Sequence, residues 1–290
     1  MGIKEQILKK SNSYKFYKEN YEKLHKLERQ NKKLKRERKN LKGKLKSDEN
    51  LIRFLFGDIA YSDDLPNYCP ICGTVTVFNP FGNPPRPNAV CPVCGSLERV
   101  RFTNVYMKYR LQHVFDNPCR VLHFAPERAF YDYFRNNKNV DYYPVDINPD
   151  FYKAMNIDIR DKVNMEEIPY EDNYFDLIYN SHVLEHVPDD LKAMRELYRV
   201  LKDDGTCLVA VPLFDIPETL QNDEYNTPEL RLKYYGQEDH LRKYGNDFTE
   251  KLKSAGFEVE ELMPKDLVSD IGKRKVLGLL EGEKLFICKK

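Results

Sequence analysis

Tryptophan is absent from this 290-residue chain, and no run of about 18 apolar residues occurs anywhere in it. A helix that crosses a bilayer needs about that many apolar residues, so the sequence predicts no transmembrane segment. The N-terminal stretch also lacks the apolar core of a secretion signal, and we expect no export. Hydrophobic residues still make up 41% of the chain, which is enough to bury a core. We therefore expect an ordered cytoplasmic protein.

Net charge is small, at +1, but the two signs are separated along the chain. Residues 1–50 carry 17 Lys and Arg against 7 Asp and Glu, whereas the remainder carries 30 against 39. A basic arm therefore precedes an acidic body. The acidic body argues against a broad nucleic-acid track, because phosphate backbones are bound by Lys and Arg.

Leucine recurs at spacings of three and four in the basic arm, which has no proline from 14 to 46. In a heptad register the d positions are Leu27, Leu34 and Leu41, and the a positions are Leu24, Asn31, Arg38 and Leu45. The seam is short and partly polar, so pairing through it alone would be weak. Three interpretations stay open: a coiled coil that forms a homodimer, a single solvated helix, and a surface for anionic lipid or nucleic acid. The lipid interpretation would make the protein peripheral to a membrane.

Seven cysteines, an odd number in a chain without a secretion signal, argue against a disulfide framework. Four of them form two C-P-x-C-G motifs: Cys69, Cys72, Cys91 and Cys94. Four thiolates at this spacing suit tetrahedral Zn²⁺, and the glycine after each pair relieves a tight turn. Four protein ligands leave no place for a catalytic water, so the zinc is predicted to be structural. Buried free cysteines or a redox pair are the alternatives.

Short apolar runs alternate with helical patterns from residue 120 onward, which predicts a parallel sheet covered by helices on both faces. The predicted strands are 120–125, 141–147, 175–180, 206–211, 257–262 and 284–288. The predicted helices are 126–136, 189–201 and 247–255.

Two predicted strand ends carry residues suited to a nucleotide cofactor, because ligands of open α/β sheets bind at the carboxyl ends of strands. The first strand enters the turn Phe124-Ala125-Pro126-Glu127 before a helix, and such a turn can cradle a cofactor. The second ends in Asp146-Ile147, and an acidic residue about twenty positions after the turn accepts the hydroxyls of a ribose.

Further along the chain, the sequence resembles class I S-adenosylmethionine-dependent methyltransferases of the type 11 branch. The matching stretches are Phe175-Asp176-Leu177-Ile178, Leu184-Glu185-His186-Val187, Arg195-Glu196-Leu197, Arg199-Val200-Leu201 and Gly205. The chain is most similar to a zinc-ribbon subgroup, many members of which lie among surface-polysaccharide genes. The resemblance implies an α/β fold with a Rossmann-like seven-stranded sheet and an antiparallel last strand at 284–288.

Three parts are expected along the chain on this basis. Residues 1–57 would be the basic coiled-coil arm, and 58–115 a zinc ribbon with a connecting helix. Residues 116–290 would be the methyltransferase domain, with an acceptor lid at 212–245. The implied cofactor is S-adenosylmethionine, and the implied partner is a small-molecule or glycan acceptor.

Further cofactor contacts follow from the same resemblance. Asn164 stands where the family has an acid that meets the adenine amine, and its amide oxygen can accept that hydrogen bond. Met165 can pack on the adenine ring. Asn180 ends the predicted strand 175–180 and is expected to contact the cofactor. Ser181 and His182 follow it, where the family places the backbone near the methionine part and the acceptor.

The first loop departs from the family pattern of acidic-x-Gly-x-Gly. His123 stands at the acidic position, and Ala125 and Glu127 replace the glycines. The ammonium of the cofactor still requires a carboxylate, and we expect Glu127 to supply it. The alternative is that Glu127 only begins a helix, where acids are favoured.

Methyl transfer to a hydroxyl usually needs a base, and His182 and His240 are the candidates. The residues predicted to contact the acceptor are Arg231, Tyr235, Asp239 and Arg242. Aromatic and polar residues suit a sugar or another polyhydroxyl compound, and the two arginines suit the phosphate of a nucleotide-linked sugar. The alternative is that His240 and Arg242 hold the lid through ion pairs with Asp239.

The stretch from His182 to His186 also spells H-x-x-E-H, the motif of inverted zinc peptidases. That chemistry requires the two histidines one helical turn apart, whereas His182 directly follows a predicted strand. We therefore expect His186 to be structural.

Three functions stay open from the sequence. The first is O-methylation of a sugar, glycan or nucleotide sugar. The second is RNA methylation, with the zinc ribbon and basic arm gripping RNA. The third is a non-catalytic scaffold whose altered first loop has lost the cofactor.

Overall fold

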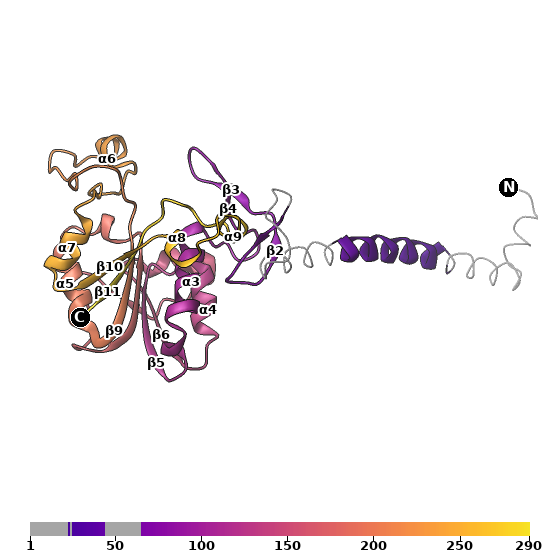
Figure 1. Ribbon diagram of the computed structural model, residues 1–290, viewed down its shortest axis with the longest axis horizontal. Coiled ribbons are helices and arrows are strands. Elements are labelled where there is room, and N and C mark those ends of the chain that lie inside the picture. Colours follow the sequence, from indigo (N-terminus) through magenta and orange to yellow (C-terminus); the bar gives the residue numbers. More distant parts are fainter. Residues whose placement is uncertain (1–22, 24, 44–64) are drawn as a thin grey trace, which may run out of the picture. The chain divides into compact units, whose positions relative to one another are not determined.

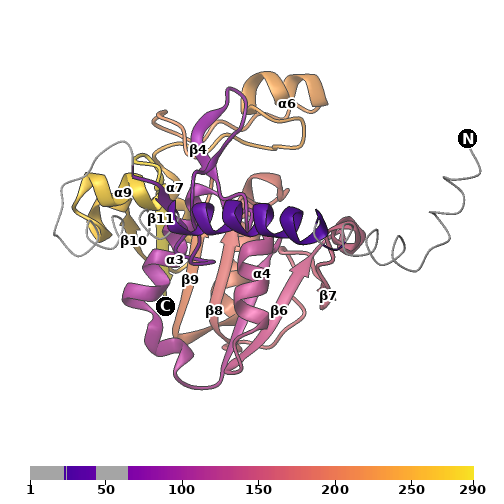
Figure 2. The ribbon, with the colours of Figure 1, turned by 90° about the vertical axis from the view of Figure 1, so that its right-hand side faces the viewer.

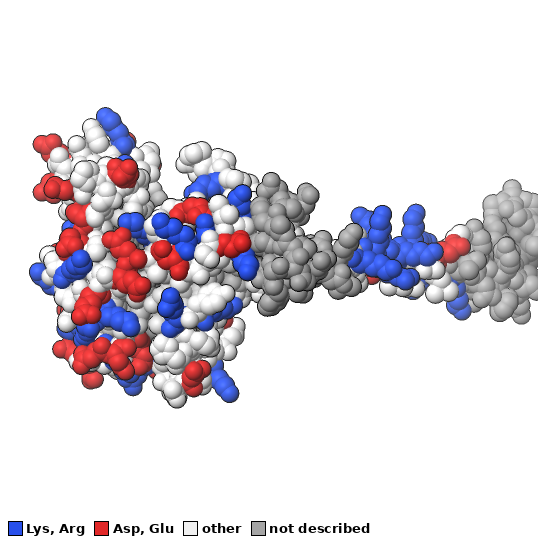
Figure 3. Space-filling model, viewed as in Figure 1, with Lys and Arg blue, Asp and Glu red and all other residues white. Residues whose placement is uncertain are grey.

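The computed structural model describes residue 23 and residues 25–43 and 65–290, in two compact units, Met1–Leu65 and Pro66–Lys290. In the first unit, residues 25–43 form a helix on which Lys and Arg gather (Figure 3). Leu27, Leu34 and Leu41 are 61%, 62% and 67% exposed on it. The other two leucines of the predicted seam, at 24 and 45, lie outside the described residues, so pairing through the arm stays a prediction. Within the described residues, every helix is too short or too polar to cross a membrane.

The second unit is built on a seven-stranded sheet with the order β10-β11-β9-β8-β5-β6-β7 (Figure 1). Its strands are β5 (Cys119–Phe124), β6 (Val140–Asp146), β7 (Asp161–Lys162), β8 (Phe175–Ser181), β9 (Leu201–Ala210), β10 (Glu258–Leu262) and β11 (Leu285–Lys289). Strands β5 to β9 pair in parallel, whereas β11 is antiparallel to both of its neighbours. The predicted fold class is confirmed, including the antiparallel strand expected at 284–288.

Apolar side chains alternate between the two faces of the central strands, as a period of two requires. On β9, Cys207 and Val209 join one hydrophobic cluster, and Leu208 joins the other. Helices α5 (Asp190–Val200) and α7 (Phe248–Ser254) complete the first cluster, and α3 (Glu98–Arg110) and α4 (Arg128–Arg135) complete the second. Figure 2 shows α4 lying over β6 and β8. The predicted three-layer arrangement is therefore present.

Shorter elements complete the unit. The ribbon has two antiparallel pairs, β1 (Asn67–Tyr68) with β2 (Val75–Thr76) and β3 (Asn79–Phe81) with β4 (Arg86–Val90). Elsewhere lie η1 (Gln112–Phe115), η2 (Pro149–Met155), η3 (Leu184–His186), α6 (Pro228–Tyr235), α8 (Pro264–Leu267) and α9 (Ile271–Leu277). α6 belongs to the segment predicted as a lid, which folds back on itself through the bridges Leu213–Tyr244 and Leu220–Lys243.

Arg101 of α3 attaches the ribbon to the rest of the unit. Its guanidinium has no exposed surface and donates to the backbone oxygens of Ala89, Ser96 and Gly278 at 3.0, 2.5 and 2.6 Å. It also lies 4.3 Å from the centroid of the Phe78 ring. Gly278 has φ +61°, and a Cβ there would lie 2.7 to 2.8 Å from Phe78 and Arg101. Ribbon, α3 and the segment after α9 are thus packed as one body.

Candidate functional site

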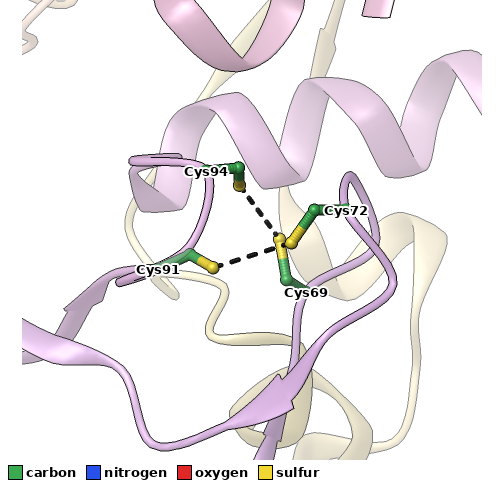
Figure 4. Close-up of side chains that lie close together, drawn as sticks. All are labelled: Cys69, Cys72, Cys91 and Cys94. Carbon is green, nitrogen blue, oxygen red and sulfur yellow. Dashed lines mark hydrogen bonds between the residues drawn. The ribbon is translucent and has the colours of Figure 1, made fainter.

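The four predicted metal ligands converge at one point, where two turns of the ribbon face each other (Figure 4). The Sγ atoms of Cys69 and Cys94 are 3.6 Å apart, and those of Cys72 and Cys91 are 3.8 Å apart. A tetrahedral ZnS₄ site with Zn–S bonds of about 2.3 Å requires sulfur–sulfur distances of about 3.8 Å. The geometry therefore fits Zn²⁺ with all four positions taken.

The two turns that carry these cysteines have the same backbone geometry. The amide of Gly73 donates to Cys69 O, and the amide of Gly95 donates to Cys91 O, both at 2.9 Å. Gly73 and Gly95 have φ values of +70° and +71°, a region that favours glycine. The glycine after each C-P-x-C pair is thus required by the turn, as the sequence predicts.

The carboxyl ends of β5, β6 and β8 lie side by side, because Phe124 pairs with both Val145 and Asn180. The turn after β5 passes through Ala125, which has φ +48°. The Ala125 amide donates to Val145 O at 3.1 Å. Although alanine replaces the family glycine, the backbone keeps the left-handed conformation that glycine favours. The turn therefore keeps this backbone shape despite the departure in sequence, and its contact with a cofactor stays a prediction.

Glu127 lies at the start of α4 with its carboxylate surrounded by polar groups. The buried His123 ring bonds its Oε2 at 3.0 Å from Nε2, while Tyr142 OH bonds the other ring nitrogen at 2.8 Å. The Tyr179 hydroxyl donates to Oε1 at 3.5 Å, and a guanidinium nitrogen of Arg99 lies 4.0 Å from the same atom. This side chain makes no hydrogen bond that caps the helix. It is therefore held at the strand edge, where the cofactor ammonium is expected.

Asp146 is held rigidly at the end of β6. Its Oδ1 accepts from the Asn148 amide at 2.7 Å, and its Oδ2 accepts from Tyr152 OH at 2.9 Å. The neighbouring Ile147 is 59% exposed. A carboxylate with both oxygens fixed at this edge still has lone pairs for the hydroxyls of a ribose.

Asn164 and Met165 follow β7 beside that carboxylate. The Val163 amide donates to Asp146 O, which brings the two segments together. Asn164 is exposed and accepts from the Glu166 amide, whereas Met165 is 3% exposed. The Asn180 Nδ2 donates to the Met165 sulfur at 3.9 Å. Asn180 is fully buried, and its Oδ1 has no hydrogen-bond partner. An unsatisfied buried acceptor at this edge fits a site that a ligand completes.

His182 follows Ser181 with φ +55° and lines a pocket of about 330 Å³. Burial and the nearby Arg99 hold the pKa of His182 well below its usual value, so the ring is neutral near pH 7. Arg99 also donates to Ser181 Oγ at 3.2 Å. The rest of the lining comes from the ribbon, α3, residues 211–213 after β9 and the turn before β11. Its charged members are Arg86, Glu98, Arg99, Glu283 and Lys284.

Sequence reasoning missed these charged residues. They come from segments far apart in the chain, and none belongs to a recognised motif. The nearest signal was the position of Arg99, which closely follows the second cysteine turn at the start of the connecting helix. Arg86 donates to both carboxylate oxygens of Glu98, at 2.9 and 3.3 Å, so the ribbon supplies an ordered charged wall of the pocket.

Glu283 lines the pocket and makes the stability of the fold depend on pH. Burial raises its pKa to about 7 despite the nearby Arg99 and Arg86. The folded chain therefore holds a proton that the unfolded chain loses above pH 4.5, and stability falls as pH rises through this window. We expect Glu283→Gln to remove about 1–2 kcal/mol of the stability difference between pH 5 and pH 8. Urea denaturation of both proteins at the two pH values checks this, with the exposed Glu258→Gln as control. An unchanged difference would contradict it.

Two of the four predicted acceptor residues serve the lid itself. Arg242 is 1% exposed and donates to the backbone oxygens of Leu184, Val187 and Pro188 and to the side chain of Gln221. Tyr235 is 1% exposed, and its hydroxyl bonds the backbone of Asn222. These contacts favour the alternative in which Arg242 holds the lid, although its acceptors are three backbone oxygens and the Gln221 side chain rather than Asp239.

The remaining lid candidates are arranged differently. Arg231 lines a second pocket, of about 230 Å³, and its buried Nε has no hydrogen-bond partner. Asp239 is exposed and lies 3.3 Å from the His186 ring. His240 is 3% exposed and packs edge-on against His186. The two predicted bases therefore differ, because His182 lines the larger pocket whereas His240 is buried behind His186.

Comparisons with known proteins agree with this fold. Residues 127–209 match the family described as "Methyltransferase domain". The chain is 46% identical over 57 residues to the ubiquinone/menaquinone biosynthesis C-methyltransferase UbiE of Vibrio vulnificus, covering 19% of this chain and 22% of that protein. It is 37% identical over 83 residues to UbiE of Psychromonas ingrahamii, covering 24% and 33%. The chain thus spans a third or less of these relatives.

Solved structures also resemble the chain. An S-adenosylmethionine-dependent methyltransferase from Archaeoglobus fulgidus has a TM-score of 0.43 at 17% identity, covering 65% of this chain and 94% of that one. A complex of the Haloferax volcanii Trm112 methyltransferase activator with a methyltransferase has a TM-score of 0.42 at 16% identity, covering 65% and 93%. The methyltransferase resemblance seen in the sequence is thus confirmed by the family match over residues 127–209.

Proposed function

We propose that this protein is an S-adenosylmethionine-dependent methyltransferase that methylates a hydroxyl of a sugar, glycan or nucleotide sugar. The observation that carries the proposal is the strand edge of the sheet. There, Glu127 follows β5, Asp146 ends β6, and the unsatisfied Asn180 lies at the carboxyl end of β8; these strands are adjacent and parallel. When bound, the cofactor supplies an electrophilic methyl group on a sulfonium. Structural Zn²⁺ at the four cysteines is part of the same proposal.

The family match gives no information on the acceptor, because residues 127–209 include none of the pocket's charged side chains. We therefore infer the class of acceptor from the side chains that line the pocket. Arg86, Arg99 and Lys284 suit a phosphate or several hydroxyl oxygens. Neutral His182 in the same wall can take the hydroxyl proton as the oxygen attacks the methyl carbon. A small polar acceptor that carries an anionic group, such as a nucleotide-linked sugar, fits these residues.

Calorimetric titration of the zinc-loaded chain with S-adenosylhomocysteine tests the enzyme proposal directly. Micromolar binding would support it and justify a screen of sugar nucleotides as methyl acceptors. Absence of binding at millimolar ligand would overturn it in favour of the scaffold. RNA that binds with a steep salt dependence and accepts methyl groups would instead favour the RNA methyltransferase.

Glu127→Gln tests the role of the altered first loop. The variant keeps the shape of the side chain but removes the charge that we expect to face the cofactor ammonium. A hydrogen bond to a charged group contributes about 1.5–3 kcal/mol, so the Kd for S-adenosylhomocysteine should rise about 10- to 100-fold. Asp132→Asn, on the exposed side of the same helix, is the matched control. An unchanged Kd for Glu127→Gln would mean that the carboxylate does not contact the cofactor.

A further inference from the structure

Glu185, His186 and His240 bring three metal-ligand atoms together outside the cysteine cluster. One ligand atom from each residue lies within 4.8 Å of the other two. Glu185 and His186 belong to η3, and His240 comes from the lid segment. The two imidazole rings meet edge-on, with centroids 4.8 Å apart and planes 83° apart. The lid fold, which places residue 240 against η3, therefore creates the cluster.

Both histidine rings are arranged as metal ligands usually are. The Nδ1 of His186 lies 3.2 Å from the backbone oxygen of Asp239 and 3.3 Å from its carboxylate. His240 makes a hydrogen bond with the backbone of Tyr235, while its Nδ1 is buried without a partner. A ligating histidine typically donates one ring N–H to a carbonyl or carboxylate, which leaves a lone pair on the other nitrogen. Each ring thus has one nitrogen free to bind an ion.

Glu185 supplies the third donor and needs a partner. Its side chain has no exposed surface, and neither carboxylate oxygen has a hydrogen-bond partner. The nearest imidazole nitrogen, His182 Nδ1, is 3.4 Å away. The cation beside it, Arg242, donates to other acceptors. An ionised carboxylate buried in this way costs several kcal/mol unless a cation or hydrogen bonds offset the cost.

We propose that Glu185, His186 and His240 bind one divalent metal ion of the Zn²⁺ type. Two imidazoles and one carboxylate form a ligand set that zinc accepts with a further position left open, whereas Mg²⁺ and Ca²⁺ prefer oxygen ligands. The His186 side chain is 33% exposed, so the cluster can be reached from solvent. Of the two histidines in the H-x-x-E-H sequence, only the second, His186, is a proposed ligand, and His240 takes the place of the first. The ligand set therefore differs from that of the inverted peptidases.

The position of the site suggests its role, and this part rests on the proposed methyltransferase function. His182 lines the acceptor pocket and lies next to Glu185, so the ion sits at the acceptor end of the site. None of the three ligands lines that pocket, so a bound ion would act through His182: it would hold Glu185 beside the ring that we expect to take the hydroxyl proton.

Zinc stoichiometry tests the site without any assay of activity. The full chain is equilibrated with Zn²⁺, freed of excess by gel filtration and analysed by elemental mass spectrometry. We expect two zinc ions per chain, and one in the variants His186→Asn and His240→Asn. His113→Asn, an exposed histidine on η1, is the matched control and should keep two. His240 is buried, whereas the His186 side chain is partly exposed. If His240→Asn fails to fold, His186→Asn therefore still tests the proposal.

Titration of Co²⁺ into chain already holding one Zn²⁺ identifies the second set of ligands. The proposal expects a Co²⁺ spectrum without thiolate charge-transfer bands, lost in His186→Asn. One zinc per chain in the wild type, with no further Co²⁺ bound, overturns the proposal. Binding of S-adenosylhomocysteine is measured separately, so failure of the metal site and failure of the methyltransferase proposal can be distinguished.

Discussion

Replacing Cys91 with serine should release the zinc and unfold the ribbon over residues 66–95. The ribbon has almost no apolar core of its own, because its buried cluster consists of Cys69, Phe78 and Cys91 with Ile71 and Cys94 beside them. In such small domains the metal supplies the folding free energy, about 10–16 kcal/mol in zinc-finger peptides. We expect amide hydrogen exchange of 66–95 to lose its protection while β5, β8 and β9 retain theirs.

Cys119→Ser is the matched control for this experiment. Cys119 is also buried, but it lies on β5 and belongs to the core of the sheet. The control should keep its zinc and its protected ribbon. If Cys91→Ser retained a protected ribbon, the metal would not be structural. Unfolding of the ribbon should also remove Arg86 from the pocket wall, so acceptor binding should weaken even though the strand edge that we propose binds the cofactor is intact.

Arg101→Met should destabilise the unit Pro66–Lys290 by about 3–5 kcal/mol, or roughly 10 °C in thermal midpoint. Methionine keeps much of the volume but removes the donors to three backbone oxygens, of Ala89, Ser96 and Gly278, of which Ser96 O keeps the bond from the Cys91 amide. Each buried acceptor left without a partner costs about 1–3 kcal/mol.

Urea and thermal denaturation measure this effect. Arg110→Met makes the same chemical change in the last turn of the same helix, where the side chain is exposed. Surface changes of this kind usually shift stability by about 0.5 kcal/mol or less. An Arg101 variant as stable as the Arg110 variant would show that the carbonyl contacts contribute little.

Short apolar runs made the central strands predictable. The strand expected at 175–180 is β8, Phe175–Ser181, and the one expected at 141–147 is β6, Val140–Asp146. The strand expected at 206–211 instead begins at Leu201, because Asp203, Asp204 and Gly205 interrupt the apolar run and yet lie in β9. β7 was missed, since its two residues are exposed and polar and carry no pattern.

The site was predictable only where a motif is local in sequence. The four cysteines and the loop after β5 are local, and the structure brings each set together. The pocket walls are not, because Arg86, Arg99 and Glu283 meet only through the packing of ribbon, α3 and the turn before β11. The contact between His186 and His240 joins residues 54 positions apart and depends on the lid fold. Spacing along the chain contains no information on such contacts.

Strand β11 also determines the order in which the chain can fold on the ribosome. It lies between β9 and β10, although both precede it in the chain. Until residues 285–289 have left the exit tunnel, β10 has no neighbour in the sheet and β9 has an open edge. An unpaired edge of this kind can pair with another chain. Until residues 285–289 emerge, the nascent chain should therefore present an open sheet edge to other chains.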